Sequence, residues 1–379
     1  MTGLGSHDDR RDDVPVPSEY PERPAWSRRE RVGWGAIALA TVLGLALALL
    51  PSPYVIEKPG PVYDTLGTTE VDGEEIPLIA IPDEQTYETD GSLDLLTVLV
   101  VGRPGRTPGW LDVAAAWFDP QRAVLPVEAI YPPGISSEDR DAANEAQMVD
   151  SQQDAIAAAL VELGYDFPRD VVVQGVAEGM PADGVIEDGD VIRSVDGEPV
   201  HSVDELREAL REHGTASPAR IVVERDGEEV EVEATPEARG DQAVLGIGVR
   251  MEYEFPIDVE IQLNDVGGPS AGMMFALGII DTLTPGAMTG GERIAGTGTI
   301  DPDGSVGSIG GIRQKLWGAL DAGAGWFLAP ESNCEEVAGN VPDGLEVFAV
   351  GTLDEARTVV ETIGEGGDTS QFAGCDVEG

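Results

Sequence analysis

Basic residues are scarce in this 379-residue chain. It has 23 Lys and Arg residues against 71 Asp and Glu residues, which gives a formal net charge of −48. Such a charge repels nucleic acid and anionic lipid headgroups. The composition therefore excludes a DNA- or RNA-binding role, and we interpret the acidity as a solvated surface.

Lysine is scarcer still. Lys58 and Lys315 are the only two lysines, and every other basic residue is Arg. Arg cannot lose its proton near neutral pH, whereas a buried Lys can. A lysine in so Arg-biased a chain therefore suggests a chemical reason for its presence.

Histidine and a phosphate-binding loop are the next absences. The three histidines are His7, His201 and His213, so none lies in the C-terminal third. A Ser-His-Asp triad in that part would need a histidine from elsewhere in the chain. No G-x-x-x-x-G-K-[ST] motif occurs, so we expect no bound nucleotide.

Cysteine occurs only at Cys334 and Cys375. Outside the cell the two could form a disulfide that holds the Gly-rich C-terminal segment; two free thiols are the alternative. No histidine or further cysteine lies near either one. We therefore predict no metal site and no cofactor.

Residues 32–50 form a long run without charge, VGWGAIALATVLGLALALL. As a helix it would extend about 28 Å, close to the hydrocarbon thickness of a bilayer. Because Arg28, Arg29 and Arg31 precede it, we predict a single transmembrane helix over 32–51, with a cytoplasmic N-terminus and the rest of the chain extracytoplasmic. The alternative is a cleaved signal peptide, because Ala46-Leu47-Ala48 has the small-x-small form.

The remaining segments differ in the secondary structure that their residue patterns predict. Residues 142–164 contain strong helix formers and end at Gly164, whereas 166–256 indicate a small, mostly β domain with Asp-Gly turns. From about residue 258, strand and helix patterns alternate. The predicted division is a disordered tail at 1–31, the membrane helix at 32–51, then 52–165, 166–256, 257–365 and a flexible tail at 366–379. The fold class is α+β.

One Ser stands among small residues in Gly267-Gly268-Pro269-Ser270-Ala271-Gly272, before an apolar helix pattern. Backbone N–H groups at a helix N-terminus favour the oxyanion of acyl transfer. The alternative is that Ser270 is simply the N-cap of that helix. The available base is Lys315, in a predicted helix that follows Gly310-Gly311; its alternative role is an exposed lysine.

At this point the segments GGPSAGMMFALGIIDTL and GTGTIDPDGSVGSIGGIRQKLWGALDAGAGWFLAPESN resemble the proteolytic domain of Lon proteases, which use a Ser–Lys dyad. The resemblance implies that Ser270 is the nucleophile, Lys315 the base and Thr297 a supporting residue. It also implies an oxyanion loop that comprises Gly268, Pro269 and Ala271. Gly267 and Thr299 depart from the family, which often has acidic residues at these two positions.

The helix over 142–164 resembles the Lon segment that directly precedes the strand leading to the catalytic Ser. Here the two are separated by residues 166–256, which resemble a bacterial PDZ domain. The resemblance implies a PDZ domain inserted into a Lon-type domain, which binds an extended C-terminus as an added strand. Leu245-Gly246-Ile247-Gly248 resembles its carboxylate-binding loop; the alternative is an ordinary Gly-containing strand.

Together these features predict an ATP-independent serine endopeptidase, anchored in the membrane, that cleaves unfolded or flexible extracytoplasmic protein segments. Its partners would be protein or peptide substrates, and a homo-oligomeric ring is expected by analogy alone. For Lys315 to act near pH 7, it must be buried and without a carboxylate partner. The alternative is a non-catalytic membrane scaffold whose PDZ domain binds protein C-termini.

Overall fold

The computed structural model describes residues 27–71, 73–240, 242–263 and 266–375. Of the predicted tail over 1–31, the first 26 residues lie outside this part of the chain. Helix α1 already begins at Arg28 and runs to Leu49, so the last residues assigned to the tail are helical.

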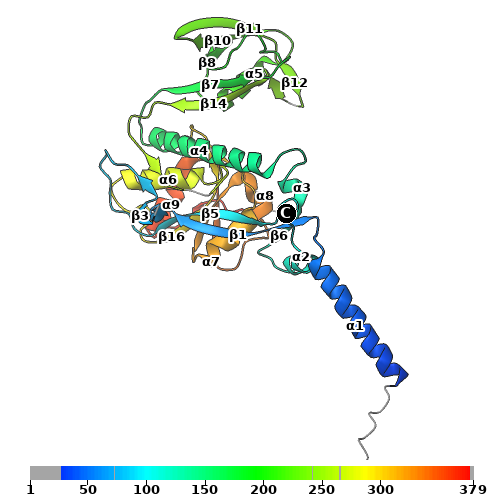
Figure 1. The fold of residues 1–379 in the computed structure, drawn as a ribbon. Helices are drawn as coiled ribbons and strands as arrows, with labels where there is room; N and C mark the ends of the chain where they lie inside the picture. The colour runs from blue at the N-terminus through cyan, green and yellow to red at the C-terminus, as the bar shows by residue number, and fades with distance from the viewer. Residues whose placement is uncertain (1–26, 72, 241, 264–265, 376–379) are drawn as a thin grey trace, which may run out of the picture.

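Helix α1 projects away from the rest of the molecule (Figure 1). It covers most of the segment predicted to span a membrane. Within the described ranges, however, no helix is both long enough and apolar enough to cross a bilayer. The predicted transmembrane helix over 32–51 is therefore not confirmed.

A mixed six-stranded sheet forms the centre of what we call the main domain, with strand order β20-β19-β16-β5-β1-β6. Strands β5, β16, β19 and β20 are parallel, and β1 is antiparallel to both β5 and β6. The bounds are β1 Tyr54–Asp64, β5 Ser92–Val101, β6 Ala123–Pro126, β16 Arg293–Gly296, β19 Trp326–Pro330 and β20 Glu346–Val350.

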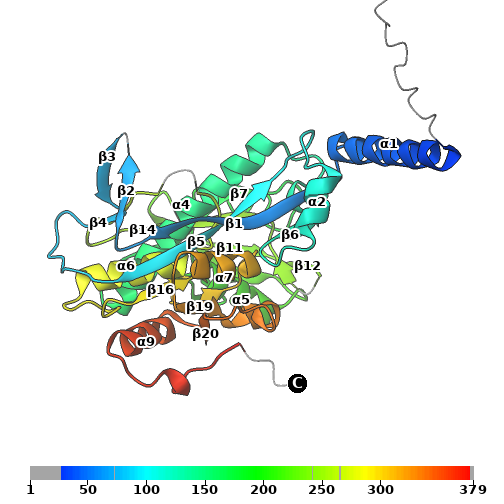
Figure 2. The same ribbon diagram turned by 90° about the horizontal axis from the view of Figure 1, so that it is seen from below.

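Helices cover both faces of this sheet, as the two views show (Figures 1 and 2). One face packs against α4 (Ser137–Glu162), α6 (Gly272–Leu283) and α9 (Leu353–Gly364), and the other against α7 (Ile312–Asp321). Period-2 alternation along the strands supplies both cores. In β16 and β19, for example, Ile294 and Leu328 join the first core, whereas Ala295 and Phe327 join the second.

Shorter elements surround the main sheet. Two-stranded ladders join β2 to β3, β4 to β15, and β17 to β18. The bounds are β2 Thr68–Val71, β3 Glu74–Pro77, β4 Ile79–Ala80, α2 Trp110–Ala116, α3 Val127–Ile130, β15 Glu260–Ile261, β17 Thr299–Ile300, β18 Val306–Gly307, α8 Cys334–Val337 and the 3₁₀ turns Glu331–Asn333 and Thr369–Gln371.

A second sheet, in the order β11-β10-β8-β7-β14, forms the inserted domain. Its tight turns have positive φ at Asp196-Gly197 and Asp226-Gly227, as the predicted Asp-Gly turns require. The domain has its own apolar core, which spans Val171 to Leu245. The bounds are β7 Arg169–Val176, β8 Val191–Val195, β9 Glu198–Pro199, α5 Val203–His213, β10 Ala219–Arg225, β11 Glu228–Ala234, β12 Glu237–Arg239, β13 Gln242–Val244 and β14 Ile247–Tyr253.

Strands β7 and β14 pair along their length, so the chain enters and leaves the inserted domain side by side (Figure 1). Before the insertion, α4 packs against α6 of the main domain. At the junction, Tyr253 Oη donates a hydrogen bond to Asp154 of α4 over 2.5 Å. The main domain is thus assembled from segments on both sides of residues 169–253.

The C-terminal segment is held against the main sheet rather than free. Cys334 and Cys375 form a disulfide, with their Cα atoms 4.7 Å apart, so the two-thiol alternative does not apply. Ala349 N of β20 donates to Ala373 O over 2.8 Å, and the Phe372 ring meets Phe348 edge to face. Of the predicted flexible tail over 366–379, the part up to Cys375 is therefore fixed, and 376–379 lie outside the described residues.

Candidate active site

Ser270 lies in the loop just before α6, which begins at Gly272 with Ala271 as its N-cap residue. Ser270 therefore does not cap the helix with its side chain. Its carbonyl oxygen accepts from Gly298 N at 3.0 Å and from Thr297 Oγ1 at 2.9 Å. These two bonds fix the Ser270 backbone and leave its hydroxyl to face α7.

Lys315 approaches this hydroxyl from α7. Its Nζ donates to Ser270 Oγ at 2.7 Å and to Thr297 Oγ1 at 2.8 Å. The three predicted residues thus form one hydrogen-bonded cluster, although they are up to 45 positions apart in the chain.

Burial dominates the electrostatics of Lys315. The residue is 2% exposed, and among the described residues no carboxylate lies within salt-bridge distance of it. Desolvation disfavours the ammonium form and lowers the pKa of Lys315 to about 7. The expected burial without a carboxylate partner is confirmed, and it favours the neutral amine of Lys315.

Glycine allows the close approach of α7 to the sheet. Gly311 precedes the helix with φ +69°, and a Cβ there would lie 2.8 Å from Val98 Cγ2 of β5. Its carbonyl accepts the Lys315 amide at 3.1 Å, which starts the turn that presents the lysine. A larger residue at 311 would displace α7 and Lys315 with it.

The loop before Ser270 rests on α4. Gly268 N donates to Asn144 O at 2.9 Å, and Ser151 Oγ donates to Pro269 O at 2.9 Å. At Gly267 a Cβ would lie 2.8 Å from the Asn144 Cβ. This crowding explains why the acidic residue common at this position in Lon proteases does not fit here.

Two backbone amides, those of Ser270 and Ala271, have no protein acceptor within the described part of the chain. They lie at the N-terminal end of α6, where the helix dipole favours negative charge. This arrangement can hold the oxyanion of a tetrahedral intermediate.

A cleft of about 550 Å³ opens beside the cluster. One wall is β5 and the other is α4 with the loop that carries Ser270. Sequence reasoning missed the wall residues Leu95–Val100 of β5 and Arg140, Asn144 and Met148 of α4. The helix was predicted over residues 142–164, but its position opposite β5 across a cleft depends on the order of strands in the sheet.

Strand β5 has an unpaired edge in this cleft. Residues 92–95 pair with β16 on one side, whereas the rest of β5 pairs only with β1 on the other side. An extended peptide can therefore add to the edge beyond Leu95 by main-chain hydrogen bonds.

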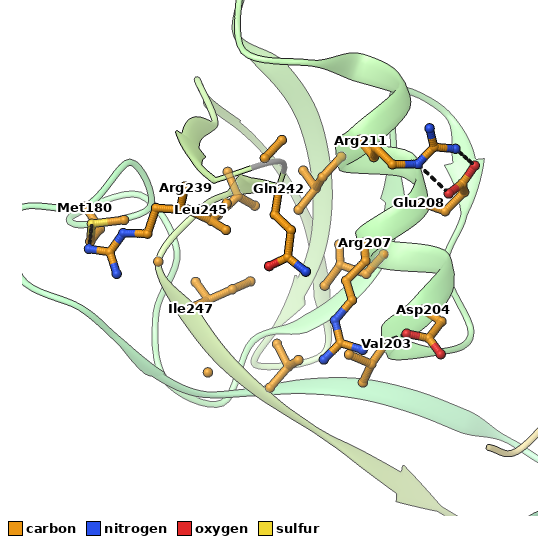
Figure 3. Close-up of a pocket in the computed structure, with 17 residues that line it drawn as sticks. Met180, Val203, Asp204, Arg207, Glu208, Arg211, Arg239, Gln242, Leu245 and Ile247 are labelled. Atoms are coloured by element: carbon orange, nitrogen blue, oxygen red, sulfur yellow. Dashed lines mark hydrogen bonds and ion pairs between the residues drawn. The ribbon is translucent and has the colours of Figure 1, made fainter. Parts of the chain in front are cut away.

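The inserted domain has a pocket of its own, of about 720 Å³, between α5 and β14 (Figure 3). The predicted Leu245, Gly246, Ile247 and Gly248 all line it. Gly246 has φ +79°, and a Cβ there would collide with Met180. Strand β14 is at the edge of its sheet, so its outer side is open to a further strand.

Arginines border this pocket. Arg207 pairs with Asp204 at 2.6 Å, and Arg211 pairs with Glu208, both within α5 (Figure 3). Arg239 reaches across to Met180, with its guanidinium 3.6 Å from the sulfur. Strand addition to β14 would bring a peptide terminus to the Leu245–Gly248 turn beside these residues.

Two segments of the chain match known domain families. Residues 134–235 match the PDZ domain family, and residues 262–362 match the Lon protease (S16) C-terminal proteolytic domain. The PDZ match starts ahead of α4 and ends before β14, whereas the structural domain comprises β7 to β14.

Lon proteases are among the similar curated proteins. Lon protease 2 of Herpetosiphon aurantiacus is 38% identical over 130 residues, which cover 32% of this chain and 15% of that protein. The Lon protease of Haemophilus influenzae is 34% identical over 125 residues, which cover 31% of this chain and 15% of that protein. The PDZ domain of an SdrC-like protein from Listeria innocua is a similar solved structure, with 22% identity, a TM-score of 0.20 and coverage of 21% of this chain and 92% of that chain.

One segment of the chain is therefore similar to PDZ domains and another to the proteolytic domain of Lon proteases. The chain spans only about 15% of the length of each of these curated Lon proteases.

Proposed function

We propose that the chain is a serine endopeptidase in which Ser270 is the nucleophile and Lys315 the general base. The observation that carries the proposal is the 2.7 Å contact between Ser270 Oγ and the buried Lys315 Nζ. A non-catalytic scaffold would not require a lysine to be desolvated against a serine hydroxyl.

Catalysis would proceed by acyl transfer. Neutral Lys315 accepts the Ser270 hydroxyl proton as Oγ attacks the peptide carbonyl carbon, and the amide N–H groups of Ser270 and Ala271 stabilise the oxyanion. The Lys315 ammonium then protonates the leaving amine, which leaves an ester on Ser270. Water, deprotonated by Lys315, hydrolyses the ester and restores Ser270.

Thr297 would position the base. Its hydroxyl accepts from Lys315 Nζ and donates to the Ser270 carbonyl, so one side chain sets the positions of both dyad members. Because these bonds hold Nζ beside Oγ before substrate binds, the dyad is preorganised.

The substrate would be an unfolded or flexible polypeptide. The cleft accepts an extended chain along the free edge of β5, and a folded domain could not present its backbone there. The chain has no phosphate-binding loop, so we propose cleavage without ATP. The pocket between α5 and β14 would bind the C-terminus of a substrate or regulator.

We further propose that the catalytic domain is extracytoplasmic and tethered by α1. Support comes from the disulfide between Cys334 and Cys375, since disulfides persist mainly in oxidising compartments. Arg28 and Arg29 at the start of α1 and exposed apolar residues such as Ile37 and Val42 fit a tether whose N-terminus faces the cytoplasm.

The test is degradation of an unstructured protein such as casein by the purified full chain, without nucleotide. We expect wild type to cleave casein, Ser270→Ala to be inactive with unchanged thermal unfolding, and Lys315→Arg to be inactive and less stable, because it buries a permanent cation. Activity retained in Lys315→Arg would contradict the assignment of the base, because Arg stays protonated. Binding of C-terminal peptides by a chain that never cleaves would favour the scaffold.

A further inference from the structure

The end of α1 is joined rigidly to a small surface of the main domain. Pro51 forms a β-bridge with Gly109, and Ser52 N donates to Pro108 O at 3.0 Å. Thr107 Oγ1 donates to Ser52 O at 2.5 Å. These bonds fix α2, which starts at Trp110, beside the end of α1 (Figure 1).

Basic residues gather beside this joint. A pocket of about 590 Å³ is lined by the cations Lys58, Arg103, Arg106 and Arg122. Arg103 and Arg106 bracket a tight turn, closed by reciprocal backbone hydrogen bonds of 3.2 and 2.9 Å. Pro104 and Gly105, with φ +81° at the glycine, form the tip of the turn and place the two arginines opposite each other at its base.

The cations of this pocket face few carboxylates. In the described part of the structure no carboxylate pairs with Lys58, Arg103 or Arg106; Arg122 pairs with Asp119 at 2.8 Å. Asp112 is the single acidic residue of the pocket, and its carboxylate accepts from Gly109 N at 3.3 Å. The pocket therefore has an excess of positive charge, which is complementary to an anionic surface.

Large apolar side chains are exposed next to the cations. In and just after α2, Leu111 is 52%, Trp117 59% and Phe118 90% exposed. The Trp117 ring rests edge-on against Tyr54, which starts the strand that follows α1. The exposed apolar side chains of α1, such as Leu43 and Leu45, lead directly to this patch.

We propose that this foot surface, formed by Lys58, Arg103, Arg106, Arg122, Leu111, Trp117 and Phe118, docks onto an anionic lipid bilayer. Trp117 and Phe118 would enter the boundary between headgroups and acyl chains, and the cations would bind lipid phosphates. The net charge of −48 repels the rest of the molecule from such a surface, so the contact sets one orientation of the main domain. This inference does not depend on proteolysis.

A single fluorophore can test the docking, because both cysteines of the chain are disulfide-bonded. Phe118→Cys is labelled with an environment-sensitive dye, and the full chain is reconstituted into phosphatidylcholine vesicles with or without phosphatidylglycerol. The matched control is Val149→Cys on α4, also an exposed apolar position. We expect a blue-shifted emission, protected from aqueous iodide, only for position 118 and only with phosphatidylglycerol.

Charge variants sharpen the test. Arg103→Gln and Arg106→Gln should each lower the ratio of docked to undocked dye about fivefold. Arg220→Gln, an exposed arginine of the inserted domain, should leave the ratio unchanged. Circular dichroism of each variant reports folding independently of activity.

Two results would overturn the proposal. One is an emission at position 118 that is the same in both kinds of vesicle and equal to that in detergent. The other is complete undocking of position 118, seen as loss of the blue shift, when about 10 mM inorganic phosphate is added at constant ionic strength. Because the ionic strength does not change, screening should weaken a contact with the bilayer very little. That undocking would show that the pocket takes a free anion instead.

Discussion

Lys315 and Lys58 are the two lysines of the chain, and they occupy opposite surroundings. Lys315 is buried against Ser270 and Thr297, and desolvation lowers its pKa to about 7. Lys58 is half-buried on β1 and lines an open pocket among arginines. The comparison shows that burial, rather than residue type, decides which lysine can act as a base.

The same comparison separates local from global electrostatics. A net charge of −48 favours protonated lysines everywhere in the molecule. Carboxylates beyond about 10 Å are largely screened at ordinary ionic strength, whereas desolvation acts at the residue itself. Near Lys315 the local contribution outweighs the global one, because no described carboxylate lies within salt-bridge distance.

The largest expected effect comes from removing each lysine in turn. Lys315→Met should lower kcat/KM for casein peptides about 10³-fold or more, because the nucleophile loses its base. Lys58→Met, the matched control, should stay within about twofold of wild type, as a change outside the catalytic cluster. Equal losses of kcat/KM in the two variants would show that Lys315 has no catalytic role that Lys58 lacks.

The next effect concerns the disulfide that holds the C-terminal segment near α8. Cys334→Ser should lower the free energy of unfolding of the main domain by about 3 to 4 kcal/mol, because the bridge closes a long loop in the unfolded chain. The inserted domain, which has a separate core, should unfold unchanged. Thermal unfolding with and without reductant measures both; a uniform shift of the two domains would argue against their independence.

The low pKa of Lys315 also predicts a pH dependence of stability. The folded pKa of about 7 lies below the unfolded value of about 10.4, so the unfolded chain binds more protons between these values. Stability should therefore rise from pH 7 to pH 10, by about 3 to 4 kcal/mol from this group. Denaturant unfolding of wild type and Lys315→Met isolates this contribution; identical slopes would refute it.

The smallest expected effect concerns Thr297. Thr297→Val keeps the shape but removes the hydroxyl that bonds Lys315 Nζ, and kcat should fall about tenfold. Thr297→Ser should restore most of the activity, since it retains the hydroxyl. If Thr297→Ser were as impaired as Thr297→Val, the methyl group rather than the hydrogen bond would position the base.

Local patterns and the family resemblance predicted which side chains meet at the candidate site, namely Ser270, Thr297 and Lys315. The small residues around Ser270 and the glycines before Lys315 indicated places where the backbone is closely packed. Such runs can be recognised in the sequence itself. The long helix α4 and the Asp-Gly turns of the inserted domain were also predictable, because their signals lie within a few residues.

Features that depend on distant neighbours were not predictable in this way. Strand β1 contains Pro59-Gly60-Pro61, which argue against a strand, yet a bulge between Pro59 and Val62 lets it pair with β5. The role of Asn144 in supporting the Ser270 loop depends on α4 packing beside that loop. Neither the strand order nor this helix contact can be predicted from a local sequence pattern.

The most direct test of the account is the ionisation of Lys315 itself. Because the chain has only two lysines, lysine labelled with ¹³C at Cε gives two NMR signals, which Lys58→Arg assigns. The account predicts that the Lys315 signal titrates with a pKa near 7, matching the acidic limb of the kcat/KM profile for casein peptides. A Lys315 titration near 10, as for free lysine, would contradict a neutral base at physiological pH.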